Sequence, residues 1–150
     1  TAFAMKNCDG KIPAKIDFQP DDLKILNKFQ ENLDTIRSKM NEQNINFYID
    51  FIVNTLFETN KYFNDQEPWK KKDDILRLST IVYTSLEVVR KICYMLYPII
   101  PQSSLKALKI FSIGEENIEY SSINNHNFLK GGNKIHKIDI LFDKIELNND

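Results

Sequence analysis

The sequence has few of the residues from which phosphate sites, metal sites and disulfide scaffolds are built. Its 4 Gly never take the spacing of a phosphate-binding loop. Its 2 Cys, Cys8 and Cys93, are far apart and outside any metal-ligand or redox spacing. Each stands among helix-forming residues, where a single Cys is usually a small buried apolar side chain. We therefore expect a reducing, cytoplasmic compartment.

Long apolar runs are absent as well. The sequence contains no stretch of about 18 apolar residues, the length that a membrane-spanning helix needs. Residues 1–6 also lack the pattern of a signal peptide, so we expect no membrane partner. The sequence lacks an initiator Met and begins within a helical pattern. We therefore expect the chain to be a fragment of a longer protein.

Candidate catalytic groups are equally scarce. No Ser, Cys or Thr lies in a recognisable nucleophile turn. The two histidines, His126 and His136, lie in a polar stretch outside any metal spacing, and we expect both to be exposed and inert. The acidic residues are scattered over predicted helix surfaces, where a solvated face is expected. The sequence therefore predicts no catalytic residue, no metal site and no cofactor within the chain.

The balance of charge argues against a protein that coats DNA. The formal net charge is -1 at pH 7, whereas a DNA-coating domain is normally basic. A nearly neutral domain can still recognise a few exposed RNA bases, because stacking and a local basic patch supply the affinity. We expect no DNA partner.

A helical periodicity of apolar residues is the main positive signal. Three long segments repeat apolar residues at three- and four-residue steps, and a shorter helix follows Pro101. Asp9-Gly10 ends an earlier helix, and Asp21 or Asp22 is a natural N-cap for the first long one. The predicted helices cover about 21–40, 45–66, 74–96 and 102–110. The fold class is all-α, a helical bundle of about four to five helices with an extended C-terminal tail.

These segments predict one domain over residues 1–150. Residues 1–8 form the end of a truncated first helix, 21–113 the helical bundle, and 114–150 an irregular to extended tail that lies on the bundle.

One local group of residues suggests binding. The only Trp, Trp69, follows Pro68 at a predicted helix end and is followed directly by three lysines, Lys70 to Lys72. An unpaired base stacked on an indole is stabilised by ~1–3 kcal/mol, and adjacent lysines can contact the flanking phosphates. From the spacing alone, an indole that packs onto the core beside solvated lysines is the favoured interpretation.

A resemblance to a known family favours the first of these interpretations. Four segments, in the same order along the chain, resemble motifs of the anticodon-binding domain of methionyl-tRNA synthetases. They are Lys6-Asn7-Cys8-Asp9-Gly10, Asn60-Lys61-Tyr62 with Glu67-Pro68-Trp69, Leu96-Tyr97-Pro98-Ile99-Ile100-Pro101, and Leu141-Phe142-Asp143-Lys144-Ile145-Glu146. Together they span nearly the whole chain, although Glu67 stands where the family usually has a small Ala.

The resemblance implies a helical bundle of the class I synthetase type that receives the CAU anticodon loop of methionine-specific tRNA. Trp69 would stack on the anticodon cytosine, with Pro68 positioning it and Lys70 and Lys71 beside it. The family's Asn and Arg that hydrogen-bond this cytosine would precede Thr1. So would a catalytic domain that uses ATP and Mg²⁺ to charge tRNA with methionine.

Two alternatives stay open at this point. The chain could be the equivalent domain of another class I synthetase. It could also be a helical adaptor that binds a protein partner through an apolar groove, and this adaptor hypothesis predicts that Trp69 is buried.

Overall fold

The computed structural model describes residues 1–142, which are helical and contain no strand. The α-helices are α1 (Ala2–Asn7), α2 (Pro20–Asn41), α3 (Ile45–Gln66), α4 (Ile75–Leu96) and α5 (Pro101–Leu108). Short 3-10 helices are η1 (Pro68–Lys70), η2 (Lys109–Phe111), η3 (Glu115–Asn117) and η4 (Tyr120–Asn124). The predicted all-α bundle is therefore confirmed.

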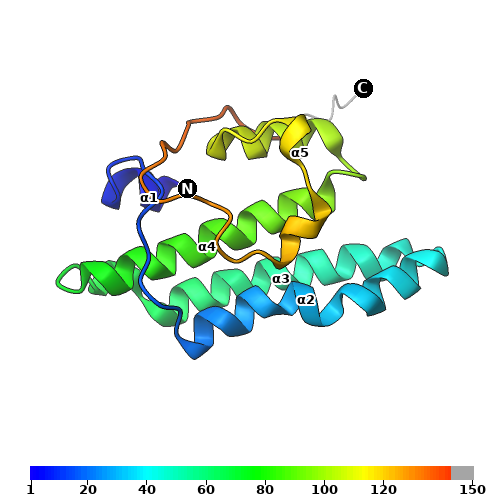
Figure 1. Ribbon diagram of the computed structural model, residues 1–150, viewed down its shortest axis with the longest axis horizontal. Coiled ribbons are helices and arrows are strands. Elements are labelled where there is room, and N and C mark those ends of the chain that lie inside the picture. Colours follow the sequence, from blue (N-terminus) through cyan, green and yellow to red (C-terminus); the bar gives the residue numbers. More distant parts are fainter. Residues whose placement is uncertain (143–150) are drawn as a thin grey trace, which may run out of the picture.

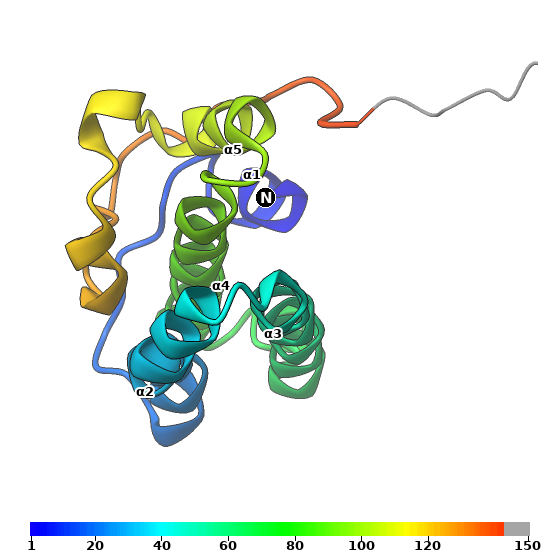
Figure 2. The same cartoon turned by 90° about the vertical axis from the view of Figure 1, so that its right-hand side faces the viewer.

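Helix α4 is the centre of the bundle. It packs against α2 and α3 on one side and against α5 on the other, and η4 lies against both α4 and α2 (Figures 1 and 2). Helices α2 and α3 form a hairpin whose two arms lie side by side in both views. Residues on every face of α4 are buried, among them Ile81 and Val88 with no exposed area. None of the helices within residues 1–142 is long and apolar enough to cross a membrane.

The helix ends follow from capping residues. The side chains of Asn44 and Asp74 accept hydrogen bonds from backbone N–H groups in the first turns of α3 and α4. Pro101 is the first residue of α5, as predicted. The N-cap of α2 was predicted wrongly: it is Gln19, and Asp22 closes a capping box by accepting from the Gln19 N–H at 2.8 Å.

Part of the tail pairs with the connector between α1 and α2. The Ile12 N–H donates to the Asn133 carbonyl at 2.8 Å, and the Gly132 N–H donates to the Ile12 carbonyl at 2.8 Å. Ile135 is fully buried, so this stretch lies on the bundle. Residues 143–146 of the closing motif, and the rest of the tail to 150, lie outside the described residues.

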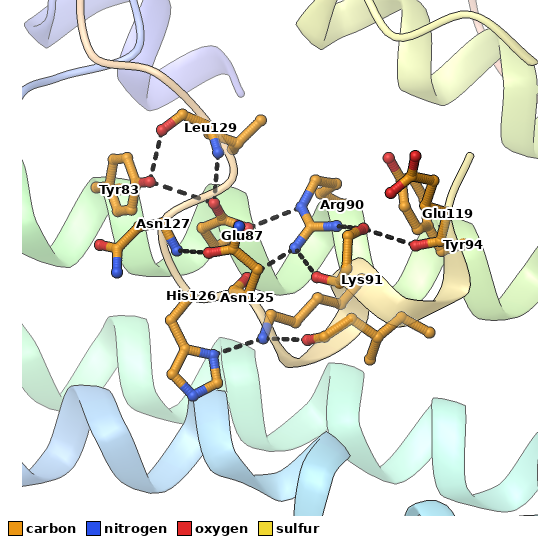
Figure 3. A network of polar contacts seen from close by, with 12 residues as sticks. Tyr83, Glu87, Arg90, Lys91, Tyr94, Glu119, Asn125, His126, Asn127 and Leu129 are labelled. Atoms are coloured by element: carbon orange, nitrogen blue, oxygen red, sulfur yellow. Dashed lines mark hydrogen bonds and ion pairs between the residues drawn. The ribbon is translucent and has the colours of Figure 1, made fainter. Parts of the chain in front are cut away.

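Several charged side chains of α4 are buried, which contradicts the expectation of solvated acidic faces. Glu87 and Arg90 form an ion pair at 2.8 Å with no exposed area on either side chain. Glu87 also accepts from the Leu129 N–H at 2.6 Å, and Arg90 donates to the Ser122 carbonyl at 3.1 Å (Figure 3). The ion pair is thus where the segment after η3 is attached to α4.

His126 belongs to the same polar network, so the expectation that it would be exposed and inert was wrong. Its Nδ1 lies 2.7 Å from Lys91 Nζ (Figure 3), and its Nε2 lies 2.8 Å from the Asn27 side-chain oxygen. The residue therefore joins the tail to both α4 and α2. His136, by contrast, is exposed as expected.

Candidate nucleic-acid interface

The loop between α3 and α4 carries the residues that the sequence singled out. Helix α3 ends at Gln66, and Glu67 takes the left-handed conformation with φ 44° and ψ 55°. This sharp turn leads into Pro68, whose fixed φ suits the first position of the 3-10 helix η1. Pro68 is buried, so its ring anchors the turn that presents Trp69.

Trp69 lies at the surface of this loop and keeps 41% of its area exposed. Its indole ring is tilted against Phe63, with the ring centroids 6.3 Å apart. Phe63 in turn meets Phe3 of α1 edge to face at 5.4 Å. Because the indole packs against Phe63 while 41% of Trp69 stays exposed, it can accept a flat apolar group.

The lysines beside Trp69 differ in their surroundings. Lys70 is exposed, and its ammonium forms an ion pair with the Glu67 carboxylate at 2.7 Å. Lys71 is partly buried, whereas Lys72 is exposed. The structure therefore brings Pro68, Trp69, Lys70 and Lys71 together in one short loop, with the charge of Lys70 partly balanced by Glu67.

A buried ion pair lies at the base of the loop. Arg77 of α4 donates to both carboxylate oxygens of Asp22 of α2, at 2.6 and 2.9 Å. Arg77 also donates to the Gln66 side-chain oxygen at 2.6 Å, and the Tyr62 hydroxyl donates to Asp22. Residues from α2, α3 and α4 thus meet at the end of α3, where the loop begins.

The environment of this pair favours its charged form. Burial opposes ionisation of Asp22, but hydrogen bonds from Arg77 and Tyr62 outweigh it and hold the pKa of Asp22 below its usual value. Burial and the hydrogen bond to this carboxylate raise the pKa of the Tyr62 hydroxyl, which stays a donor.

The sequence contained a signal for this ion pair that the analysis of apolar periodicity missed. Asp22 lies three and four residues before Ile25 and Leu26, so it belongs to the apolar stripe of α2. Arg77 lies four residues before the buried Ile81 in the same way. A charged residue at a core position of each helix predicts a buried partner of opposite charge.

Comparison with known proteins identifies the family. Residues 12–150 match the family model described as the anticodon binding domain of methionyl tRNA ligase. The methionine–tRNA ligase of Brucella suis is 34% identical over 119 residues, which cover 79% of this chain and 23% of that protein. The methionine–tRNA ligase of Rickettsia felis is 33% identical over 153 residues, which cover 97% of this chain and 29% of that protein.

Solved structures agree with this assignment. The chain superposes on the apo form of Mycobacterium tuberculosis methionyl-tRNA synthetase with a TM-score of 0.86 and 24% identity, over 97% of this chain and 30% of that one. The same enzyme bound by methionyl-adenylate gives a TM-score of 0.85 with 25% identity, over 94% and 28%.

The chain spans about a quarter of the length of the curated relatives it matches. The family model and the relatives are all named for methionine, which argues against the alternative that the domain belongs to a synthetase for another amino acid. The chain belongs to the family of methionyl-tRNA ligase anticodon-binding domains.

Proposed function

We propose that this chain reads the CAU anticodon of methionine-specific tRNA, with Trp69 as the platform on which the first anticodon base stacks. The observation that carries this proposal is the 41% exposure of the only Trp, on a loop between two helices of an anticodon-binding domain. An exposed indole beside lysines has the two components that bind unpaired RNA: a stacking surface and positive charge near the backbone.

The neighbouring residues take supporting roles. Pro68 holds the turn, and Lys71 meets a phosphate beside the stacked base. Lys70 exchanges its ion pair with Glu67 for a phosphate contact when RNA binds. Each such contact releases counterions, so binding weakens as salt rises.

In the whole protein this domain would supply specificity to a methionine–tRNA ligase. A separate catalytic domain would use ATP and Mg²⁺ to activate methionine and join it to the tRNA, and we assign no residue of this chain to that chemistry. A wrong anticodon is rejected because its base leaves polar groups of the site without partners.

The adaptor hypothesis has less support, since it requires a buried Trp69 and 41% of the area of this residue is exposed. It makes an opposite prediction about RNA, which allows a direct test. The chain is titrated at low salt with anticodon stem-loops that carry CAU or UAU, while the fluorescence of Trp69 is followed. We expect CAU to quench the emission. Because the Asn and Arg that hydrogen-bond the cytosine would precede Thr1, we expect discrimination against UAU only in a protein that includes them.

A matched pair of variants assigns the effect to stacking. Trp69→Ala removes the indole, and Phe57→Ala removes an aromatic ring of α3 that is 68% exposed. Loss of stacking worth ~1–3 kcal/mol raises the Kd for a labelled CAU stem-loop about 5- to 150-fold in the first variant. The second should bind like the wild type. Emission that no stem-loop quenches, with a Kd unchanged in Trp69→Ala, would support the adaptor instead.

A further inference from the structure

The Asp22–Arg77 ion pair is placed where three helices meet the loop of Trp69. The carboxylate of Asp22 is fully buried, and the Arg77 side chain is 6% exposed. The two-pronged contact, at 2.6 and 2.9 Å, fixes the plane of the guanidinium against the carboxylate. Arg77 therefore has one orientation relative to α2.

Arg77 contacts the loop that carries Trp69 at both of its ends, through its guanidinium on the α3 side and through its backbone N–H on the α4 side. On the α3 side, Gln66 accepts from Arg77 at 2.6 Å, one residue before the turn at Glu67. On the α4 side, the Arg77 N–H donates to the Asp74 carboxylate at 3.0 Å, and the Asp74 N–H donates to the Lys71 carbonyl at 3.0 Å. The contacts of Arg77 thus close the loop at its base.

Trp69 lies on a short loop whose backbone is strained. It is 41% exposed, and its aromatic neighbour is Phe63. The backbone beside it turns through the left-handed conformation of Glu67, which a residue with a Cβ adopts only when its surroundings impose it. The orientation of the indole consequently depends on how the loop ends are held.

A buried ion pair is a costly way to gain stability, because both charges lose their hydration. Its geometry here is better explained by what it holds in place. We propose that Asp22 and Arg77 are positioning residues. Their ion pair, through the hydrogen bond from Arg77 to Gln66, keeps the loop and the indole of Trp69 in the one orientation that accepts a base. This inference rests on the proposed function for the identity of that base.

The orientation of Trp69 can be measured without RNA. The single Trp is replaced by 5-fluorotryptophan, so that the fluorine spectrum of the chain contains one resonance. Asp22→Asn removes the charge of the pair, and Gln66→Ala removes one loop contact while it leaves the pair intact. We expect the resonance to shift and to broaden or split in both variants, because the indole samples more than one orientation.

The second buried ion pair of α4 provides a matched control. Glu87→Gln breaks the Glu87–Arg90 pair, which is at least as deeply buried but holds the tail instead of the loop. Spectra are recorded well below each variant's melting temperature, so that only folded chain contributes. The resonance should stay in place in Glu87→Gln, even if its melting temperature falls as far as that of Asp22→Asn.

Binding then links orientation to specificity. In the intact protein, the ratio of the Kd values for UAU and CAU stem-loops should fall about 10-fold in Asp22→Asn and stay unchanged in Glu87→Gln. A fluorine resonance that Asp22→Asn and Gln66→Ala leave unmoved would overturn the inference. A wild-type protein that does not distinguish CAU from UAU would instead count against the proposed function, while the fluorine experiment would still decide the positioning role.

Discussion

Lys91 is a fully buried lysine whose ionisation should make the stability of the domain depend on pH. Its ammonium donates to the Ile123 carbonyl at 2.6 Å and lies 2.7 Å from His126 Nδ1. Burial, and secondly the charge of Arg90, lower the pKa of Lys91 from 10.5 to about 7, although Glu87 opposes the shift. In the unfolded chain the pKa returns to its usual value.

The direction of the effect follows from proton counting. Between pH 7 and pH 10.5 the unfolded chain binds a proton on Lys91 that the folded chain has largely released. The free energy of unfolding therefore rises with pH in this window, by about 2 kcal/mol from pH 7 to pH 9. Burial raises the pKa of Cys93 from 9.0 to about 11, so above pH 9 the unfolded chain releases this thiol proton while the folded chain keeps it. This contribution lowers the free energy of unfolding as the pH rises further.

Urea denaturation followed by circular dichroism at pH 7, 8 and 9 measures this rise. Lys91→Met replaces the lysine by an apolar side chain of similar length. The rise in the free energy of unfolding from pH 7 to pH 9 should therefore be smaller in this variant by about 2 kcal/mol. Lys24→Met removes an exposed lysine and should leave the profile parallel to that of the wild type. Parallel profiles of the wild type and Lys91→Met would refute the assignment of the rise to Lys91.

Four other substitutions test the packing and the backbone conformation. Ile81→Ala, at a fully buried position of α4, should lower the free energy of unfolding by about 2–5 kcal/mol, whereas Ile75→Ala, at a position 67% exposed, should change it by less than about 0.5 kcal/mol in urea melts. Tyr83→Phe removes the hydroxyl that donates to the Leu129 carbonyl at 2.6 Å and should cost about 1–2 kcal/mol in the same assay. Glu67→Gly relieves the left-handed strain and should raise the melting temperature by roughly 2 °C; a fall would show that its ion pair matters more.

The helices could be predicted from the sequence because their ends are determined locally. Asn44 and Asp74 cap α3 and α4 through their own side chains, and Pro101 begins α5 with a φ that is already helical. Each of these signals acts within three or four residues of its position. The start of α2 was less certain, because both Asp21 and Asp22 suit an N-cap and only the capping box with Gln19 decides between the positions.

The buried polar contacts could not be predicted in the same way. Glu87 can be buried because its carboxylate accepts hydrogen bonds from Arg90 and from the Leu129 N–H, and Leu129 lies 42 residues away in the sequence. His126 likewise is partly buried because it meets Lys91 and Asn27 across three elements of the fold. Such contacts depend on how the elements pack, which the pattern of apolar residues in one segment does not contain.

The loop around Trp69 combines three features that lower stability. A large apolar ring remains 41% exposed, Glu67 holds a left-handed backbone, and the buried charges of Asp22 and Arg77 lie beneath. The tail network contains buried charges as well, but they attach a segment that buries Ile135 completely, so folding alone accounts for them. At the loop, by contrast, Trp69 stays 41% exposed. An exposed apolar ring, a strained backbone and buried charges that occur together indicate a binding site more often than a purely structural feature. This contrast separates the proposed base platform from the rest of the bundle.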